Sequence, residues 1–222
     1  MLMDMLRMKI PQEEFDYQTL MGALDEYARP RDKISDLLKK GIIIRVKKGL
    51  YVFGEAYRKA PYSKEILANL MFGPSYISLE YALQYHGLIP ERVEAVTSVT
   101  TGRSRRFLTP VGLFTYRRIS LDAFRIGMDR KEIGERRAFL IATPEKALAD
   151  KIYTDRRHGI RTKKMMSDYL ENNLRIDPAD LMNLKPETLD IIARRYRSKK
   201  IQLLSDLLHR AKSRFQKESD HA

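Results

Sequence analysis

Eight basic side chains lie between residues 29 and 48, where the chain has only two acids, so this segment carries a net charge of +6. Lysine and arginine neutralise phosphate oxygens, and this supplies the sequence-independent part of nucleic-acid binding. A basic face can equally be a solvated face, so the elements that present these side chains decide between the two. The candidate DNA contacts are Arg29, Arg31, Lys33, Lys39, Arg45, Lys47 and Lys48.

The same segment predicts a short helix followed directly by a hairpin. Pro30 suits the first helical position and Gly41 a left-handed C-cap, and apolar residues recur at helical spacing between them. The run 42–46 is β-branched, 47–49 reads as a turn, and 50–53 can return as the partner strand. This order is typical of a winged helix-turn-helix, whose helix enters a DNA groove while the hairpin tip contacts flanking phosphates.

Composition limits the remaining function classes. The 222 residues have an apolar share of 43%, which suffices for a core. The net charge of +13 indicates a polyanionic partner, either nucleic acid or an acidic membrane surface. The sequence has no apolar run near the roughly 20 residues of a membrane span, and its start lacks a signal-peptide pattern. It also has no cysteine for a thiolate nucleophile or zinc site. We expect a cytoplasmic protein that binds no membrane and needs no cofactor.

Periodicity predicts a mixed α+β chain in three parts. Residues 1–56 would form the winged helix-turn-helix domain, with one or two helices over 15–28 ahead of the DNA-contacting helix. Residues 57–155 would form an α/β domain, and 156–222 a basic helical extension packed on it. Within the second part we expect helices over 63–72, 79–86 and 143–153, and strands over 94–101, 111–118 and 138–142.

A second basic patch lies in the acid-free span 99–118. Its first arginines fall in 102–110, which we expect to be a long connection between two strands. The patch could bind phosphates or an acidic protein, or could be a solvated loop. Its arginines are Arg103, Arg105, Arg106, Arg117 and Arg118.

Two groups of side chains invite an enzymatic interpretation. His86 ends a short helix, where the helix dipole already favours a histidine. Asp150 follows Lys146 by four residues, and this spacing predicts a surface ion pair. Nucleotide-binding and metalloprotease motifs are absent from the sequence. We therefore expect no catalytic residues and no metal site, and consider the protein not to be an enzyme.

Four pieces of sequence between residues 74 and 153 form an ordered set: SYISLEYALQYHGLIPE, VTSVTTGRSRRF, VGLFTYRRI and ATPEKALADKIY. The set resembles the AbiEi-type antitoxin and predicted transcriptional regulator family of type IV toxin–antitoxin and abortive-infection systems. The upstream GIIIRVKKGLYVF looks like the end of that family's winged N-terminal domain. The resemblance covers roughly residues 15 to 155, and the basic tail departs from it.

The resemblance implies a repressor of its own operon that binds operator repeats in double-stranded DNA. It also implies an α/β antitoxin domain that counteracts a nucleotidyltransferase toxin without a stable complex. The DNA contacts would fall on the helix start and on the wing, and the family has no catalytic residues to transfer. The rivals are a nucleic-acid-processing enzyme, a stand-alone regulator, and a protein-interaction module. The mapped contacts are Arg29, Arg31, Lys33, Lys47 and Lys48.

Overall fold

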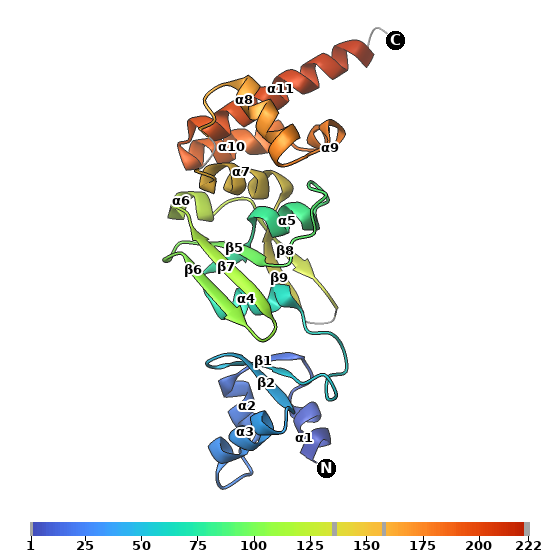
Figure 1. Ribbon diagram of the computed structural model, residues 1–222, viewed down its shortest axis with the longest axis vertical. Helices are drawn as coiled ribbons and strands as arrows, with labels where there is room; N and C mark the ends of the chain where they lie inside the picture. Colours follow the sequence, from blue (N-terminus) through green and yellow to red (C-terminus); the bar gives the residue numbers. More distant parts are fainter. Residues whose placement is uncertain (1, 135–136, 157–158, 220–222) are drawn as a thin grey trace.

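The structure, a computed structural model, describes residues 2–134, 137–156 and 159–219 and has mixed α+β content. Figure 1 shows three tiers along the long axis: an N-terminal unit, a sheet with its covering helices, and a helical C-terminal part. This mixed content confirms the expected α+β class. Within the described residues, no helix is long and apolar enough to cross a membrane.

The N-terminal unit packs helices on an antiparallel sheet of order β1-β3-β2. The helix, turn and hairpin predicted between 30 and 53 are confirmed, with Pro30 in the first turn and Gly49 at a φ of 86°. The helices predicted over 15–28 are confirmed only over 17–23. Residues 14–16 instead form the short strand β1, which the sequence does not predict because three residues are too few to show periodicity. The elements are α1 (Leu2–Lys9), β1 (Glu14–Asp16), α2 (Tyr17–Ala23), α3 (Pro30–Lys39), β2 (Ile43–Lys47) and β3 (Leu50–Phe53).

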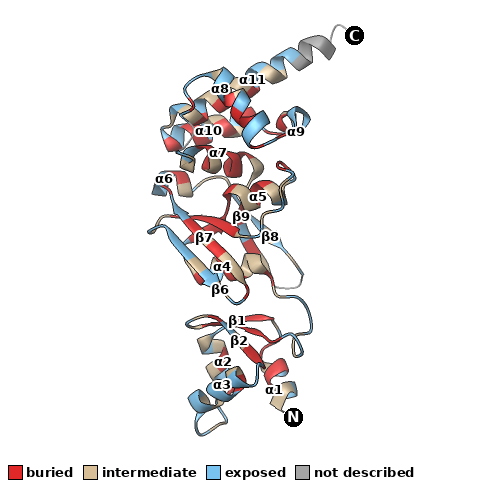
Figure 2. Ribbon diagram, in the orientation of Figure 1, coloured by how far each residue is buried: buried red, intermediate tan, exposed pale blue. Residues whose placement is uncertain are grey.

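All four residues of strand β3 are buried, and Figure 2 shows buried segments in red within the small N-terminal sheet. Successive side chains of a strand point to opposite faces. Tyr51 and Phe53 accordingly join the core beneath α2 and α3. Leu50 and Val52 join the separate core of the sheet domain that follows. The small N-terminal sheet is therefore the wall between the two cores.

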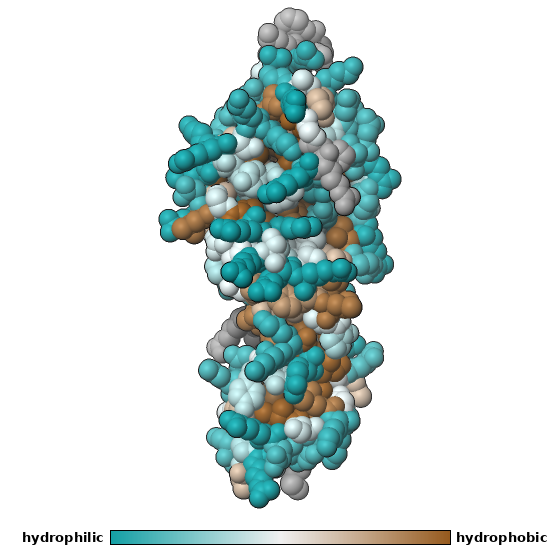
Figure 3. Space-filling view, turned by 60° about the vertical axis from the view of Figure 1, so that its left-hand side comes forward, coloured by the Kyte–Doolittle hydropathy of each residue, from teal (hydrophilic) through white to brown (hydrophobic). Residues whose placement is uncertain are grey.

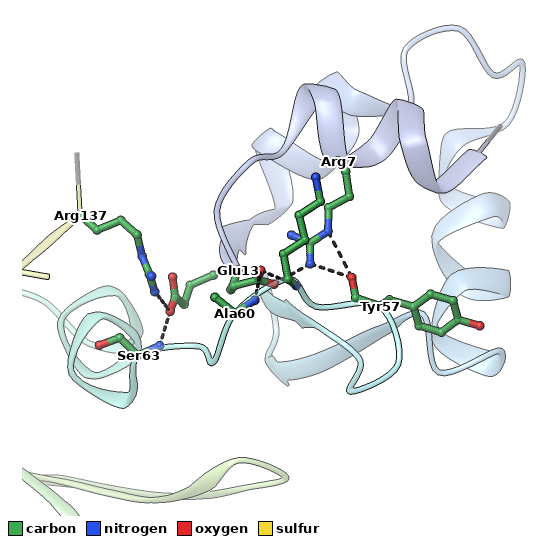
Figure 4. Close-up of polar contacts among 8 residues, drawn as sticks. Arg7, Glu13, Tyr57, Ala60, Ser63 and Arg137 are labelled. Atoms are coloured by element: carbon green, nitrogen blue, oxygen red, sulfur yellow. Dashed lines mark hydrogen bonds and ion pairs between the residues drawn. The ribbon is translucent and has the colours of Figure 1, made fainter. Parts of the chain in front are cut away.

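Glu14 connects the N-terminal unit to the next domain with a buried carboxylate. Its Oε1 atom accepts from the backbone N–H of Ser63 and, at 2.7 Å, from Arg137 Nη2. Figure 4 shows both donors converging on this oxygen from separate segments. Residues 54–63 are the linker between β3 and the next helix, and Ser63 is the N-cap of that helix. One carboxylate thus fixes β1 to the start of the second domain.

Its neighbour Glu13 holds the linker. Oε1 of Glu13 accepts from the backbone N–H groups of Lys59 and Ala60, at 2.9 and 3.1 Å. Its other oxygen is 2.7 Å from Arg7 Nη2, which also donates to the Tyr57 carbonyl at 2.7 Å. Hydrogen bonds to a buried carboxylate are among the stronger ones in proteins. These hydrogen bonds hold the linker against the N-terminal unit at Tyr57, Lys59 and Ala60.

The second domain is built on a mixed sheet of order β6-β7-β5-β4-β9-β8. Strands β5 and β7 are parallel, as are β4 and β9, whereas β6–β7 and β8–β9 are antiparallel pairs. The elements are α4 (Lys64–Met71), β4 (Ser75–Ile77), α5 (Leu79–Tyr85), β5 (Val96–Thr100), β6 (Arg105–Thr109), β7 (Gly112–Arg118), α6 (Leu121–Phe124), β8 (Met128–Glu132), β9 (Ala138–Ala142) and α7 (Pro144–Thr154).

One expectation in this domain was wrong. Residues 105–109 do not belong to a long connection but form the edge strand β6, which pairs with β7 through Phe107 and Phe114. The sequence does not predict this strand, because two of its five residues are arginines, only two are apolar, and a proline follows its last residue. The predicted helices over 63–72, 79–86 and 143–153 and the three predicted strands are confirmed within one to two residues at most ends.

The C-terminal part is helical, as expected, and shares its core with the sheet domain. Ile201, Leu204 and Leu208 lie on one side of the last helix and are fully buried. Its far end extends away from the N-terminal unit (Figure 1). The elements are α8 (Lys163–Asp168), a π-helical segment η1 (Tyr169–Asn173), α9 (Pro178–Met182), α10 (Pro186–Tyr196) and α11 (Lys199–Ser219).

Lys146 and Asp150 form an ion pair, but it is wholly buried, which corrects the expectation of a surface pair. Lys146 Nζ also donates to the Tyr196 hydroxyl at 2.7 Å, and Ser78 Oγ donates to Asp150 at 2.5 Å. Burial lowers the pKa of Lys146 and raises the pKa of Asp150, while their attraction opposes both shifts. Helical spacing places the two side chains together, but only packing by α5 and α10 buries them.

We predict that Asp150→Asn destabilises the protein by about 3 kcal/mol, because it leaves a buried ammonium without its counter-ion. The double variant Lys146→Met with Asp150→Leu should lose clearly less stability than Lys146→Met alone and Asp150→Leu alone lose in total. Urea unfolding followed by circular dichroism measures both. Glu132→Gln, in an exposed ion pair with Arg130, is the control and should change stability by less than about 0.5 kcal/mol. Additive single effects would contradict this account.

Candidate nucleic-acid interface

Helix α3 presents its first turn to solvent. Buried Ile34 and Leu37 anchor the helix on the N-terminal core. Arg29 at the N-cap and Arg31 are exposed, while the half-buried Lys33 lies 5.1 Å from the centroid of the Tyr27 ring. The helical periodicity that buries two aliphatic residues thus leaves the basic start of α3 outside.

The exposed side of α3 is mixed in charge. Asp32 and Asp36 are exposed between the basic residues, and Arg29 Nη1 lies 3.9 Å from a carboxylate oxygen of Asp32. Lys39 is exposed in the last turn. A surface with both positive and negative side chains can accept as well as donate hydrogen bonds. A surface that binds only phosphate needs donors alone.

The two lysines of the hairpin turn have different surroundings. Lys47 is half-buried: its Nζ donates to the Met71 carbonyl at 2.7 Å and lies 5.2 Å from the centroid of the Phe107 ring. Lys48 is exposed, as is Arg45 on the strand before it. Of the two hairpin lysines named as candidate DNA contacts, only Lys48 is exposed, because the second domain covers the hairpin at Lys47.

The second basic patch lies on the β6–β7 hairpin at one edge of the sheet. All five of its arginines are exposed. The antiparallel register places Arg105 opposite Tyr116 and Arg106 opposite Thr115. Alternation along a strand then puts Arg105 and Arg118 on one face of the hairpin and Arg106 and Arg117 on the other. The arginines therefore lie on both faces of the sheet edge. Lys47 of the N-terminal hairpin packs against Phe107 within the same strand β6.

The contacts between the two domains were missed at the level of sequence. Met71 and Phe107 hold Lys47, and Glu14 with Arg137 joins residues 123 positions apart. These pairings depend on tertiary contacts that no local pattern contains.

The remaining side chains that could take part in catalysis or bind a metal have structural roles or are too scattered. His86 is the C-cap of α5, and its Nε2 lies 2.8 Å from the Ala142 carbonyl oxygen. Within residues 2–134, 137–156 and 159–219, no group of three or more His, Cys, Asp or Glu is placed to hold a metal. An open pocket of about 410 Å³ beside α1 is lined by Met3, Asp4, Arg7, Met8, Ala56, Tyr57 and Lys59.

Comparison with known proteins adds no identification. The chain matches no family model and no curated protein.

We predict that Lys47→Ala lowers the free energy of unfolding by about 1.5 to 3 kcal/mol, because it removes a hydrogen bond from a charged donor and an aromatic contact. Lys48→Ala removes the same charge from an exposed neighbour and should change stability by less than about 0.5 kcal/mol. Urea titration of the two variants provides the comparison. Equal effects would show that Lys47 does not hold the domains together.

Proposed function

We propose that the protein is a DNA-binding transcriptional regulator with a winged helix-turn-helix at its N-terminus. The observation that carries the proposal is the element order α1-β1-α2-α3-β2-β3 with an antiparallel β1-β3-β2 sheet and an exposed basic start of α3. An α-helix fits the DNA major groove, and helix-turn-helix proteins read base edges from the start of their second helix.

The exposed residues of α3 suit base reading. Arg31 in the first turn can donate two hydrogen bonds to guanine, and Asp32 and Asp36 can accept from cytosine. The flanking basic residues Lys39, Arg45 and Lys48 are exposed and suit phosphate contacts that position the helix without reading sequence. We leave Lys47 out of this set because its amine is engaged with Met71.

The regulatory mechanism would be occlusion of a promoter. We further propose that the chain is an AbiEi-type antitoxin that represses its own operon and counteracts a nucleotidyltransferase toxin in the cytoplasm. The ordered motifs between 74 and 153 support this extension. In the structure these motifs supply the framework of one domain: β4, α5, β5, β6, β7 and α7.

The enzymatic alternative has less support. The best-formed group of reactive side chains is Lys146, Asp150 and Tyr196, and these are buried in the core between α7 and α10. A nucleic-acid-processing site has to reach a phosphate or a base at the surface, and the basic patches lie elsewhere.

We predict that the protein binds duplex DNA from upstream of its own gene, and that affinity falls steeply with salt because phosphate contacts release counterions. Arg31→Ala should cost about 1 to 3 kcal/mol on the preferred sequence and little on other sequences. Lys48→Ala should weaken binding to all sequences alike. Fluorescence anisotropy at two ionic strengths measures both effects.

The control for this experiment is Lys199→Ala, an exposed charge at the start of α11. It should bind as the wild type does. Absence of duplex binding, or binding that is independent of salt, would refute the proposed function.

A further inference from the structure

The β6–β7 hairpin carries positive charge that the protein itself does not neutralise. Four arginines on its strands, and Arg103 two residues before β6, stand in the acid-free span 99–118. In the part of the chain that the structure describes, none of them is in an ion pair with a carboxylate. By contrast, the basic side chains of α1 and α7 have acidic partners. The hairpin is thus a concentrated and uncompensated positive surface.

The opposite edge of the same sheet shows that this charge exceeds what an edge strand needs. Charged side chains protect exposed edges from pairing with other chains. On β8 they come in both signs and pair locally, Arg130 with Glu132 and Lys131 with Asp129. The β6 edge has arginines only. Protection from aggregation therefore explains the paired charges of β8, but it does not explain the unpaired positive charge of β6–β7.

The arginine hairpin lies beside the N-terminal hairpin. Phe107 in the middle of β6 is the ring against which Lys47 packs, so β6 lies beside the hairpin tip that carries the exposed Lys48. Strand β6 and helix α3 also lie toward the same side of Figure 1. Figure 3 brings that side forward and shows long hydrophilic side chains over both tiers.

We propose that the β6–β7 hairpin is a second DNA-binding element, whose arginines contact the phosphate backbone beside the segment read by α3. This inference rests on the proposed function and adds the sheet domain to the DNA-binding surface. The occupant follows from charge complementarity: a polyphosphate backbone presents regularly spaced anions, and arginine pairs well with phosphate oxygens. Because Lys47 of the N-terminal hairpin is engaged with Met71, the neighbouring β6–β7 hairpin would supply further backbone contacts beside that of Lys48.

The test replaces four arginines, Arg105, Arg106, Arg117 and Arg118, by glutamine and titrates a mixed-sequence duplex at several salt concentrations. Losing four phosphate contacts should make the slope of log affinity against log salt shallower by about 3 to 4. Between 50 and 200 mM salt, the variant should then lose about 100-fold less affinity than the wild type does.

The matched control removes the same charge from the other end of the molecule, by replacing the exposed Arg194, Arg195, Arg210 and Arg214 of α10 and α11 with glutamine. It should retain the wild-type slope. Thermal unfolding checks that both variants fold. If the hairpin variant does not fold, Arg106→Gln with Arg117→Gln takes its place and should show about half of the change in slope.

Three results would overturn the inference. In the first, the hairpin variant keeps the wild-type slope while Arg31→Ala loses its sequence preference. This result would support the proposed function but would show that the β6–β7 hairpin does not contact DNA. Equal changes in both four-residue variants would indicate only a general charge effect. Arginine-dependent binding to poly-L-glutamate, with no such dependence for the duplex, would assign the hairpin to an acidic protein partner.

Discussion

The burial of β3 on both faces is the constraint on which the rest of the structure depends. In a half-exposed hairpin the outer face would be polar, but Leu50 and Val52 are apolar and lie in the core of the second domain. Separating the domains would expose this face to water, at a cost of about 1.5 to 3 kcal/mol for each large side chain. The small sheet therefore fixes where α3 stands relative to the large sheet.

Polar contacts give this apolar joint a defined orientation. Glu13 and Glu14 satisfy backbone N–H groups at 59, 60 and 63, and the partners of their carboxylates are distributed over α1, the linker and the start of β9. A buried carboxylate with several donors tolerates little displacement, because each lost bond leaves charge without compensation. The apolar contact supplies affinity between the domains, and the glutamates restrict them to one arrangement.

Local sequence signals were sufficient for most of the fold. Proline and glycine at the ends of α3, and Thr143 with Pro144 at the start of α7, specify boundaries through backbone geometry alone. The errors arose where tertiary packing decides. Strand β6 is arginine-rich because it is an edge, and the Lys146–Asp150 pair is buried because α5 and α10 close over it. The candidate DNA contacts stay predictions, and the engagement of Lys47 depends on Met71, 24 residues further along the chain.

We propose that α3 recognises DNA and that the N-terminal hairpin and the β6–β7 hairpin contact its backbone. Hydroxyl-radical footprinting on a duplex that the protein selects tests this most directly, because it reports protection of each sugar along both strands. The account predicts two blocks of protection, one over the site read by α3 and one beside it that disappears when the four β6–β7 arginines are replaced. A single block that is unchanged in that variant would contradict it.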